Sequence, residues 1–254
     1  ENTPIRNIDF QLIGEYYAAM ERQGPGSPET TLKALSFIDK LPADAHIADL
    51  GSGTGSQTMV LAQHTAGQIT ALDLFPVFID QLKARARELK LQDRINGVVG
   101  SMDQLPFTQE SLDLIWSEGA IYNIGYERGL KEWRPYLKSG AYLAVSEVCW
   151  FTEERPEEIE KFWQADYPEI DTIARKISQM QKAGYLPVAS FILPENCWTD
   201  QYYAPQAAVQ EAFLKKHAGN PAAEAFVADA RREAALYEKY KAYYGYAFFV
   251  GRKQ

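Results

Sequence analysis

The sequence predicts an α/β fold in which a doubly wound sheet is covered by helices on both faces. Apolar runs that suit buried strands alternate with segments of helical periodicity between residues 46 and 148, and this alternation is typical of βαβ units. The first run leads through a turn with glycines at positions 51, 53 and 55 into a helix, and the second run ends in an acid, Asp73. A strand, a glycine turn and a helix N-terminus form a nucleotide-sized site in such folds.

Length and composition suit a single domain. The chain has 254 residues, of which 46% are hydrophobic and 24% are charged, so we expect one core with a lid rather than two independent domains. No stretch approaches the ~18 consecutive apolar residues of a membrane span. The polar N-terminus, Glu1–Arg6, lacks a starting Met and the apolar core of a secretory signal. Cys149 and Cys197 suit reduced thiols in a cytoplasmic protein better than a disulfide framework.

Charge and histidine spacing argue against two classes of function. The formal net charge is −8 and the sequence has no evident cluster of Lys and Arg. This disfavours a nucleic acid as the substrate, because binding a polyanion relies on such clusters. His46, His64 and His217 stand apart without the spacing of metal ligands. We therefore expect no metal site and no nucleic-acid or membrane partner.

Two helices are predicted before the first strand. Residues 9–21 have apolar side chains at helical spacing. Ser27 followed by Pro28 is a credible N-cap and first residue of a helix that runs to about Leu41. The glycine-containing loop between them, residues 24–27, is either a simple connector or a segment that closes over a bound ligand.

The turn at residues 51–55 is the most informative stretch. Glycine lets the backbone approach a ligand closely, and the N-terminus of the next helix favours a carboxylate or phosphate. A dinucleotide fingerprint would need glycine in the place of Ser56. The spacing is instead D-x-G-x-G-x-G, with Asp49 two residues before Gly51. This pattern resembles that of the class I S-adenosylmethionine (SAM)-dependent methyltransferases.

Asp73 ends the second predicted strand, residues 68–74. It lies about 20 residues beyond the glycines, where an acid accepts hydrogen bonds from ribose hydroxyls. The alternative is an N-cap for the helix that begins at Phe75-Pro76. The spacing favours the ribose.

The third predicted strand, residues 94–100, leads into a turn that holds Asp103 and then Leu105-Pro106-Phe107. The resemblance is specific here, because in the family an acid followed by Leu-Pro-Phe commonly succeeds this strand. An acid and a main-chain N–H at this turn read the adenine edge in that family. The usual Gly-Asp pair is Gly100-Ser101 in this chain, so Asp103 is the nearest acid for the role. Its alternative is an ordinary turn residue.

The segment after the fourth predicted strand, residues 112–117, faces the sulfonium in this family. Here it reads Ser117-Glu118-Gly119-Ala120, which does not match the Asn/Asp-Pro-Pro-aromatic tetrad of enzymes that methylate nucleic-acid bases. The acid pair and Asn of magnesium-dependent catechol-type enzymes are not recognisable either. Glu118 is the leading polar candidate beside the methyl group. Equally, an acid at a strand end often only accepts hydrogen bonds from backbone N–H groups.

The remaining elements complete an α/β pattern with an insertion. We predict helices at 125–138, from 153 and at 171–183, and strands at 141–148, 188–193 and 246–251. The resemblance runs from about Ala34 to Val148. An insertion at about 197–243 carries Trp198, Tyr202, Tyr203 and helices of its own. It suits a lid or an oligomer contact, such as that of a homodimer.

The resemblance implies a Rossmann-like fold with a mostly parallel seven-stranded sheet whose last strand is antiparallel. It implies a helical N-terminal cap at 1–45, a cofactor-binding core at 46–150 and a C-terminal part at 151–254. The implied activity is in-line transfer of a methyl group from SAM to a small molecule, with S-adenosylhomocysteine (SAH) as product. A SAM-binding regulatory protein without catalysis and an NAD(P)-dependent oxidoreductase are the alternatives.

Each part of SAM has expected partners. The resemblance assigns the methionyl end to the turn at 49–55, the ribose to Asp73 and the adenine to the turn at 102–103. Aromatic faces also favour the sulfonium by roughly 0.5–2 kcal/mol, so Tyr17, Tyr122 and Trp150 are the expected lining residues of the substrate site. The full cofactor set comprises Asp49, Gly51, Ser52, Gly53, Gly55, Asp73, Leu74, Met102, Asp103 and Ser117.

Overall fold

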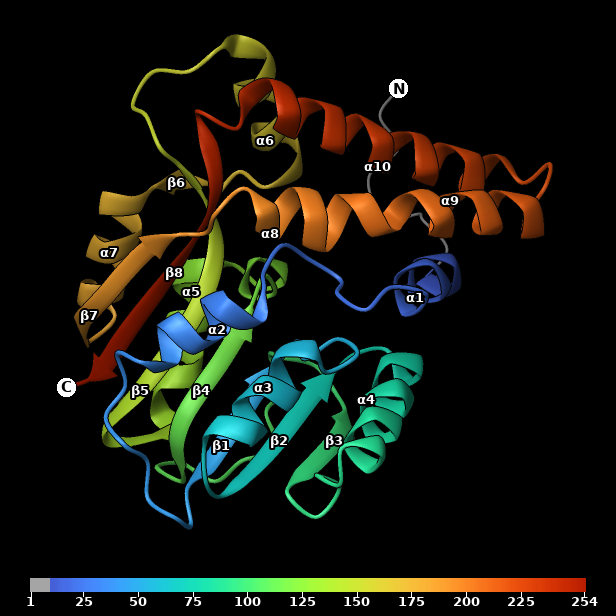
Figure 1. Ribbon diagram of the computed structural model, residues 1–254. Helices are drawn as coiled ribbons and strands as arrows, with labels where there is room; N and C mark the ends of the chain where they lie inside the picture. The colour runs from blue at the N-terminus through green and yellow to red at the C-terminus, as the bar shows by residue number, and fades with distance from the viewer. Residues whose placement is uncertain (1–9) are drawn as a thin grey trace.

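One mixed sheet organises the computed structural model, which describes residues 10–254 (Figure 1). The strand order is β3-β2-β1-β4-β5-β8-β7, and a short strand, β6, pairs with the end of β5. The first five strands run parallel, whereas β8 is antiparallel to both β5 and β7. The strands are β1 (His46–Leu50), β2 (Gln68–Asp73), β3 (Ile95–Val99), β4 (Leu112–Glu118), β5 (Leu137–Trp150), β6 (Asp171–Thr172), β7 (Tyr185–Ile192) and β8 (Tyr244–Lys253).

The predicted doubly wound fold with an antiparallel last strand is confirmed, with one strand more than the seven expected. The added strand is the two-residue β6, whose Asp171 and Thr172 pair with Cys149 and Trp150. So short a pairing leaves no periodicity to read in the sequence. The chain order reverses between β2-β1 and β4-β5, and ligands bind outside the carboxyl ends of strands at such a switch point.

Helices cover both faces of the sheet and bury a separate core on each. Side chains of α2, α3 and α4 pack on one face, and those of α5 and α7 on the other. The α6 helix packs beside the end of β5, near Trp150. These helices are α2 (Pro28–Leu35), α3 (Ser56–His64), α4 (Pro76–Glu88), α5 (Tyr126–Trp133), α6 (Glu157–Asp166) and α7 (Ile173–Lys182).

The predicted helix at 125–138 was too long. It ends at Trp133, a 3-10 turn covers Arg134–Tyr136, and β5 begins at Leu137. Pro135 has no N–H to donate to the carbonyl four residues earlier, so the α-helical hydrogen-bond pattern stops and a 3-10 turn takes over. Leu137 then pairs with Leu112 of β4, so β5 begins at Leu137 and not at the predicted position 141.

Two other boundaries moved for local reasons. The α2 helix ends at Leu35 rather than near Leu41, and the Ser36 hydroxyl donates to the Lys33 carbonyl at 2.6 Å, a bond that competes with helix continuation. The β7 strand begins at Tyr185 rather than at Val188, because it pairs with β8 as far as Lys253.

The N-terminal helix and the late insertion form one cap. It comprises α1 (Phe10–Ala18), α8 (Asn196–Trp198), a π-helical turn (Thr199–Tyr203), α9 (Ala204–Lys216) and α10 (Pro221–Tyr240). In Figure 1, α9 and α10 run side by side above the edge of the sheet to which the arrows of β2 and β4 point, with α1 next to α9. The Tyr16 hydroxyl donates to Gln206 at 2.7 Å, and Phe213 packs edge-on against the Tyr16 ring. The predicted start of the first helix, Asp9, and the N-terminus before it lie outside the described residues.

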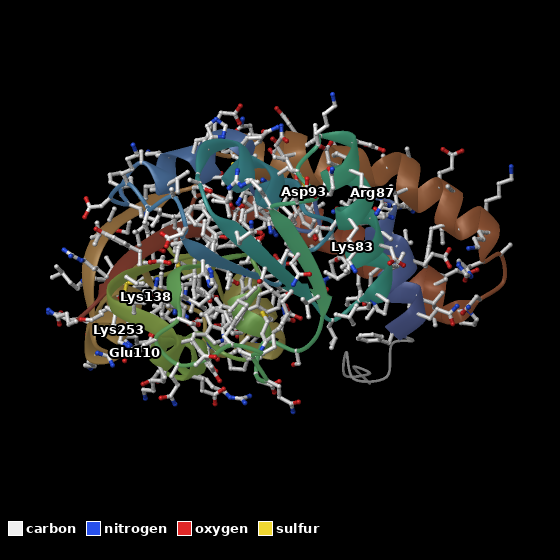
Figure 2. All side chains as sticks on the ribbon, turned by 90° about the horizontal axis from the view of Figure 1, so that it is seen from below. Lys83, Arg87, Asp93, Glu110, Lys138 and Lys253 are labelled. Carbon is white, nitrogen blue, oxygen red and sulfur yellow. The ribbon has the colours of Figure 1, made fainter. Side chains whose placement is uncertain are left out.

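The opposite end of the sheet carries charges of both signs. Figure 2 shows Lys83, Arg87 and Asp93 on one side and Glu110, Lys138 and Lys253 on the other. Lys138 is paired with Asp113 at 2.9 Å, and Lys253 with Glu110 at 3.9 Å. Within residues 10–254, no helix is both long and apolar enough to cross a membrane. The same residues contain no group of three or more His, Cys, Asp or Glu arranged to hold a metal ion.

Candidate functional site

The glycine turn between β1 and α3 is held against the end of β2. The N–H groups of Gly51 and Ser52 donate to the Leu72 carbonyl at 2.8 and 3.0 Å. Gly51 and Gly53 have φ angles of +71° and +56°, and residues other than glycine rarely adopt this backbone region. A Cβ at Gly51 would lie 2.4 Å from that of Ala120, and one at Gly53 would lie 2.2 Å from Gln23 Oε1. Glycine is therefore required at Gly51 by both conformation and space, and at Gly53 by its backbone conformation.

Asp73 lies at the end of β2, beside this turn. One carboxylate oxygen accepts from the Gly53 N–H at 2.8 Å, and the other accepts from the Phe75 N–H at 3.1 Å. The N-cap position of α4 is Phe75, so Asp73 is not the N-cap residue itself. Burial raises the pKa of Asp73 above its ordinary value. Each oxygen has one backbone donor and keeps acceptor capacity for a hydroxyl, and Leu74 next to it is 50% exposed.

Asp49 is fully buried beneath the turn. It accepts hydrogen bonds from Thr58 at 2.6 Å and from Gln57 at 3.2 Å, both in the first turn of α3. Burial raises its pKa to about 7. This carboxyl therefore ties β1 to the start of α3 and fixes the shape of the turn from below. The Ser52 hydroxyl of the turn is buried and has no hydrogen-bond partner among the described residues.

The turn after β3 lies close to the glycine turn. The Met102 sulfur is 3.4 Å from the position a Cβ would take at Gly51, and the Met102 carbonyl accepts from Trp133 Nε1 at 2.9 Å. Asp103 is exposed; it accepts from the Ser101 hydroxyl at 2.5 Å and pairs with Arg128 at 3.6 Å. The Ser101 hydrogen bond, more than the Arg128 charge, lowers the pKa of Asp103.

Glu118 is the last residue of β4, and its carboxylate contacts three polar side chains. One carboxylate oxygen accepts from the Thr31 hydroxyl at 2.5 Å and from Trp116 Nε1 at 3.0 Å. The other oxygen pairs with Arg22 at 3.3 Å, and the Glu118 and Arg22 side chains are only 3% and 6% exposed. The preceding residue, Ser117, is buried and donates to the Leu50 carbonyl at 2.8 Å. The geometry favours an anchoring role for Glu118 over that of a free base.

The segment between α1 and α2 packs on the glycine turn and is more than a connector. Gln23 Oε1 accepts from the Thr54 N–H at 3.0 Å, and its Nε2 donates to the Tyr17 carbonyl at 3.1 Å. The Thr54 hydroxyl donates to the Glu21 carbonyl at 3.0 Å. One guanidinium nitrogen of Arg22, Nη2, is buried with no partner in the described part of the chain.

Tyrosines from the core and the cap gather beside the segment that follows β4. The tyrosine cluster comprises Tyr17, Tyr122, Tyr202, Tyr203 and Tyr246. Two of its hydroxyls, those of Tyr17 and Tyr202, lie 3.4 Å apart, and the Tyr203 hydroxyl donates to Glu233 of α10 at 2.9 Å. A Cβ at Gly119 would lie 3.0 Å from the Tyr246 ring, so this ring borders the end of β4.

The three predicted lining aromatics have different surroundings. Tyr122 is 43% exposed and sits edge-on to Tyr167, and burial of its hydroxyl end raises its pKa to about 12. Tyr17 is half-buried within the cluster. Trp150 is 1% exposed and packs between Arg155 and Tyr244. This position favours core packing for Trp150.

Reasoning from sequence missed Gln23, Arg22 and Glu233 as site residues. Glu233 had a usable signal, because it lies four residues before Tyr237 and seven before Tyr240, on the buried side of α10. An acid on such a stripe is unusual. The two N-terminal residues had no comparable signal, since their partners are distant in sequence.

Comparisons with known proteins agree with this geometry. Residues 48–145 match the family model described as "Methyltransferase domain". A sarcosine/dimethylglycine N-methyltransferase of Aphanothece halophytica is 30% identical over 129 residues, which are 50% of this chain and 47% of that protein. A dimethylglycine N-methyltransferase of Parasynechococcus marenigrum is 29% identical over 44% of this chain and 40% of its own length. The matched part thus spans less than half of these curated relatives.

A solved structure shares nearly the whole fold. It is a SAM-dependent methyltransferase from Geobacter sulfurreducens in complex with SAH, with a TM-score of 0.83 and 20% sequence identity. The superposition covers 97% of this chain and 100% of that one. The shared part therefore includes the cap as well as the sheet.

Proposed function

We propose that the chain is a class I SAM-dependent methyltransferase, which transfers a methyl group from SAM to a small-molecule acceptor. The match of residues 48–145 to the methyltransferase-domain model supports this class. The observation that carries the proposal is the 2.8 Å hydrogen bond between the Gly53 N–H and Asp73. It joins the glycine turn and the acid of β2 in one site at the switch point of the sheet. The methyltransferases of small molecules among the relatives support the acceptor class.

The residues at this site fit the parts of SAM. The backbone of Gly51–Gly55 would hold the methionyl end over the N-terminus of α3, and the unpartnered buried atoms Arg22 Nη2 and Ser52 Oγ suit a carboxylate there. Asp73 would accept from the ribose hydroxyls. The exposed Leu74 side chain would cover an adenine face, with Met102 and Asp103 at its edge. Asp49 and Ser117 would act from beneath, by fixing the turn and the end of β4.

When bound, SAM supplies a methyl carbon that its sulfonium has already activated. The protein then has to align the acceptor with that carbon and exclude water. The cap formed by α1, α9 and α10 lies over the site, so it is suited to this exclusion. Glu118 would hold the N-terminal segment through Arg22 and so shape the methyl-facing side.

Other expectations are part of the proposal. The free cysteines, Cys149 and Cys197, are both buried, which supports a reducing compartment such as the cytoplasm. The net charge of −8 supports a small molecule over a nucleic acid. For a homodimer, the free edge of β7 offers exposed apolar side chains, Leu186, Val188 and Ile192. Light scattering on the purified protein tests that assembly.

Calorimetric titration with SAM, SAH and NAD tests the cofactor. We expect SAM and SAH to bind at a single site and NAD to give no heat. Tight NAD binding without a response to the sulfur ligands would overturn the proposal in favour of an oxidoreductase. A screen of small metabolites that monitors SAH release then separates an enzyme from a SAM-binding regulatory protein, for which no acceptor would release SAH.

A further inference from the structure

Glu233 is an acid on the buried side of α10 that the cofactor site does not use. Its carboxylate accepts from the Tyr203 hydroxyl at 2.9 Å. The other charged group that acts on it is a second acid, Asp166. Across residues 10–254 no lysine, arginine or histidine forms an ion pair with Glu233, whereas its neighbour Glu238 is paired with Lys241 at 3.1 Å. Glu233 is partly buried, and a carboxylate withdrawn from water is ordinarily paired with a cation. Among the described residues its one hydrogen-bond partner is instead the neutral Tyr203 hydroxyl.

Aromatic rings surround this acid. The rings of Tyr202 and Tyr203 lie 5.0 Å apart, and the Tyr202 hydroxyl reaches that of Tyr17. Tyr203 packs against two hydrophobic clusters, one that holds Tyr246 and one that holds Tyr202 with Tyr17 beside it. Burial, and after it the negative charge of Glu233, raises the pKa of the Tyr17 hydroxyl. A carboxylate among aromatic faces is the arrangement that attracts an organic ammonium ion, because the faces and the acid both carry negative potential.

The same cluster reaches the methyl-transfer side of the site. Tyr246 borders Gly119, directly after β4, and this segment faces the sulfonium in the proposed function. The cap brings Tyr17 from α1 and Glu233 from α10 to the same place. The acid and the expected methyl donor therefore lie on two sides of one group of tyrosines.

We propose that Glu233 and the tyrosine cluster form the acceptor site, and that the acceptor is a small amine. This inference rests on the proposed function and adds its substrate class. The protonated amine would pair with the Glu233 carboxylate and contact the rings of Tyr17, Tyr203 and Tyr246. An acceptor with a carboxylate or phosphate at that end would be repelled by Glu233 and Asp166.

The reaction balances with Glu233 as the proton acceptor. The ammonium gives one proton to the carboxylate, which leaves a nitrogen lone pair. That pair forms the bond to the methyl carbon while the carbon–sulfur pair returns to sulfur, which becomes the neutral thioether of SAH. Burial raises the pKa of Glu233 to about 7, closer to that of an amine than an ordinary carboxyl, and this improves proton transfer.

Ammonium binding to the SAH-loaded protein tests the assignment. We use dimethylammonium and choline as probes, with 3,3-dimethylbutan-1-ol as the neutral analogue of choline. The wild type should bind at least one ammonium probe and should bind choline roughly tenfold or more tightly than its neutral analogue. Glu233→Gln should weaken ammonium binding by about tenfold, and Tyr203→Phe by a smaller factor. Neither variant should change the affinity for SAH.

Glu238→Gln is the matched control, since it removes the same charge from an exposed position on the same helix. It should bind every probe as the wild type does. Equal binding of choline and its neutral analogue, no binding of either ammonium, or an unchanged Glu233→Gln affinity would each overturn the amine assignment. SAH binding would still stand in those cases. A wild type that does not bind SAH would instead overturn the proposed function.

Discussion

Asp73 is the single residue that joins the glycine turn to the start of α4. It fixes the glycine turn through the Gly53 N–H and the start of α4 through the Phe75 N–H. Its charge and remaining lone pairs are available to ribose hydroxyls. A carboxylate has acceptor sites for both these N–H groups and a ligand, so the structural contacts leave the proposed ribose role open.

Asp73→Ala should therefore weaken SAH binding by roughly 10- to 100-fold, because hydrogen bonds to a charged group contribute about 1.5–3 kcal/mol. Calorimetric titration with SAH measures this change. Asp80→Ala is the control, since Asp80 lies exposed on α4 and should leave the affinity unaltered. Circular dichroism checks that both variants are folded. Equal affinities for the two variants would remove Asp73 from the cofactor site.

Among the elements, the segment between α1 and α2 links the cap to the candidate site. It connects α1 to α2 and is fastened to β4 by the Arg22–Glu118 pair and to the glycine turn by Gln23. Both members of the pair are nearly fully buried. Loss of one partner leaves a buried charge uncompensated, which commonly costs about 3–5 kcal/mol.

A double-mutant cycle with Arg22→Met and Glu118→Gln separates anchoring from catalysis. If the pair is an anchor, the losses of unfolding free energy in the two single variants should add up to more than the loss in the double variant. The difference, which is the coupling energy, should be roughly 1–3 kcal/mol. Urea unfolding measures it, and both single variants should weaken SAH binding similarly. If Glu118 is instead the base, Glu118→Gln should abolish SAH release at unchanged SAH affinity, and Arg22→Met should not.

Short-range patterns explain what could be read from the sequence about these elements. The β1–turn–α3 unit and Asp73 follow from spacing within about 30 residues, as the βαβ pattern requires, and their places in the fold were predicted correctly. The end of α5 was missed although Pro135 marked it. The cap could not be predicted as one unit, because it depends on contacts such as Tyr16 with Gln206, 190 positions apart.

Two buried carboxyls, those of Asp49 and Glu147, and the partly buried Glu233 make the stability of the whole molecule sensitive to pH. Burial raises the pKa of Asp49, Glu147 and Glu233 to about 7 in each case. Glu147 is the clearest case, because it is 1% exposed and neither of its oxygens has a hydrogen-bond partner among the described residues. The Lys176 charge offsets only part of this burial. The folded protein thus holds protons on these groups that the unfolded chain has released.

Unfolding free energy should consequently fall as pH rises from about 5 to about 7, because across this range the folded state binds more protons than the unfolded state. Below the ordinary pKa of 4.5 for glutamate, Glu147 is protonated in both states and has no effect; above about 7 the full loss is reached. For Glu147 the loss is on the order of 3 kcal/mol, because the pKa rises from 4.5 to about 7 and each unit is worth about 1.4 kcal/mol. Urea unfolding at several pH values measures this slope. Glu147→Gln cannot titrate, so its slope should be shallower than that of the wild type whatever its stability at any one pH. Stability that rises with pH in the wild type, or equal slopes in the two proteins, would contradict the assignment of these protons.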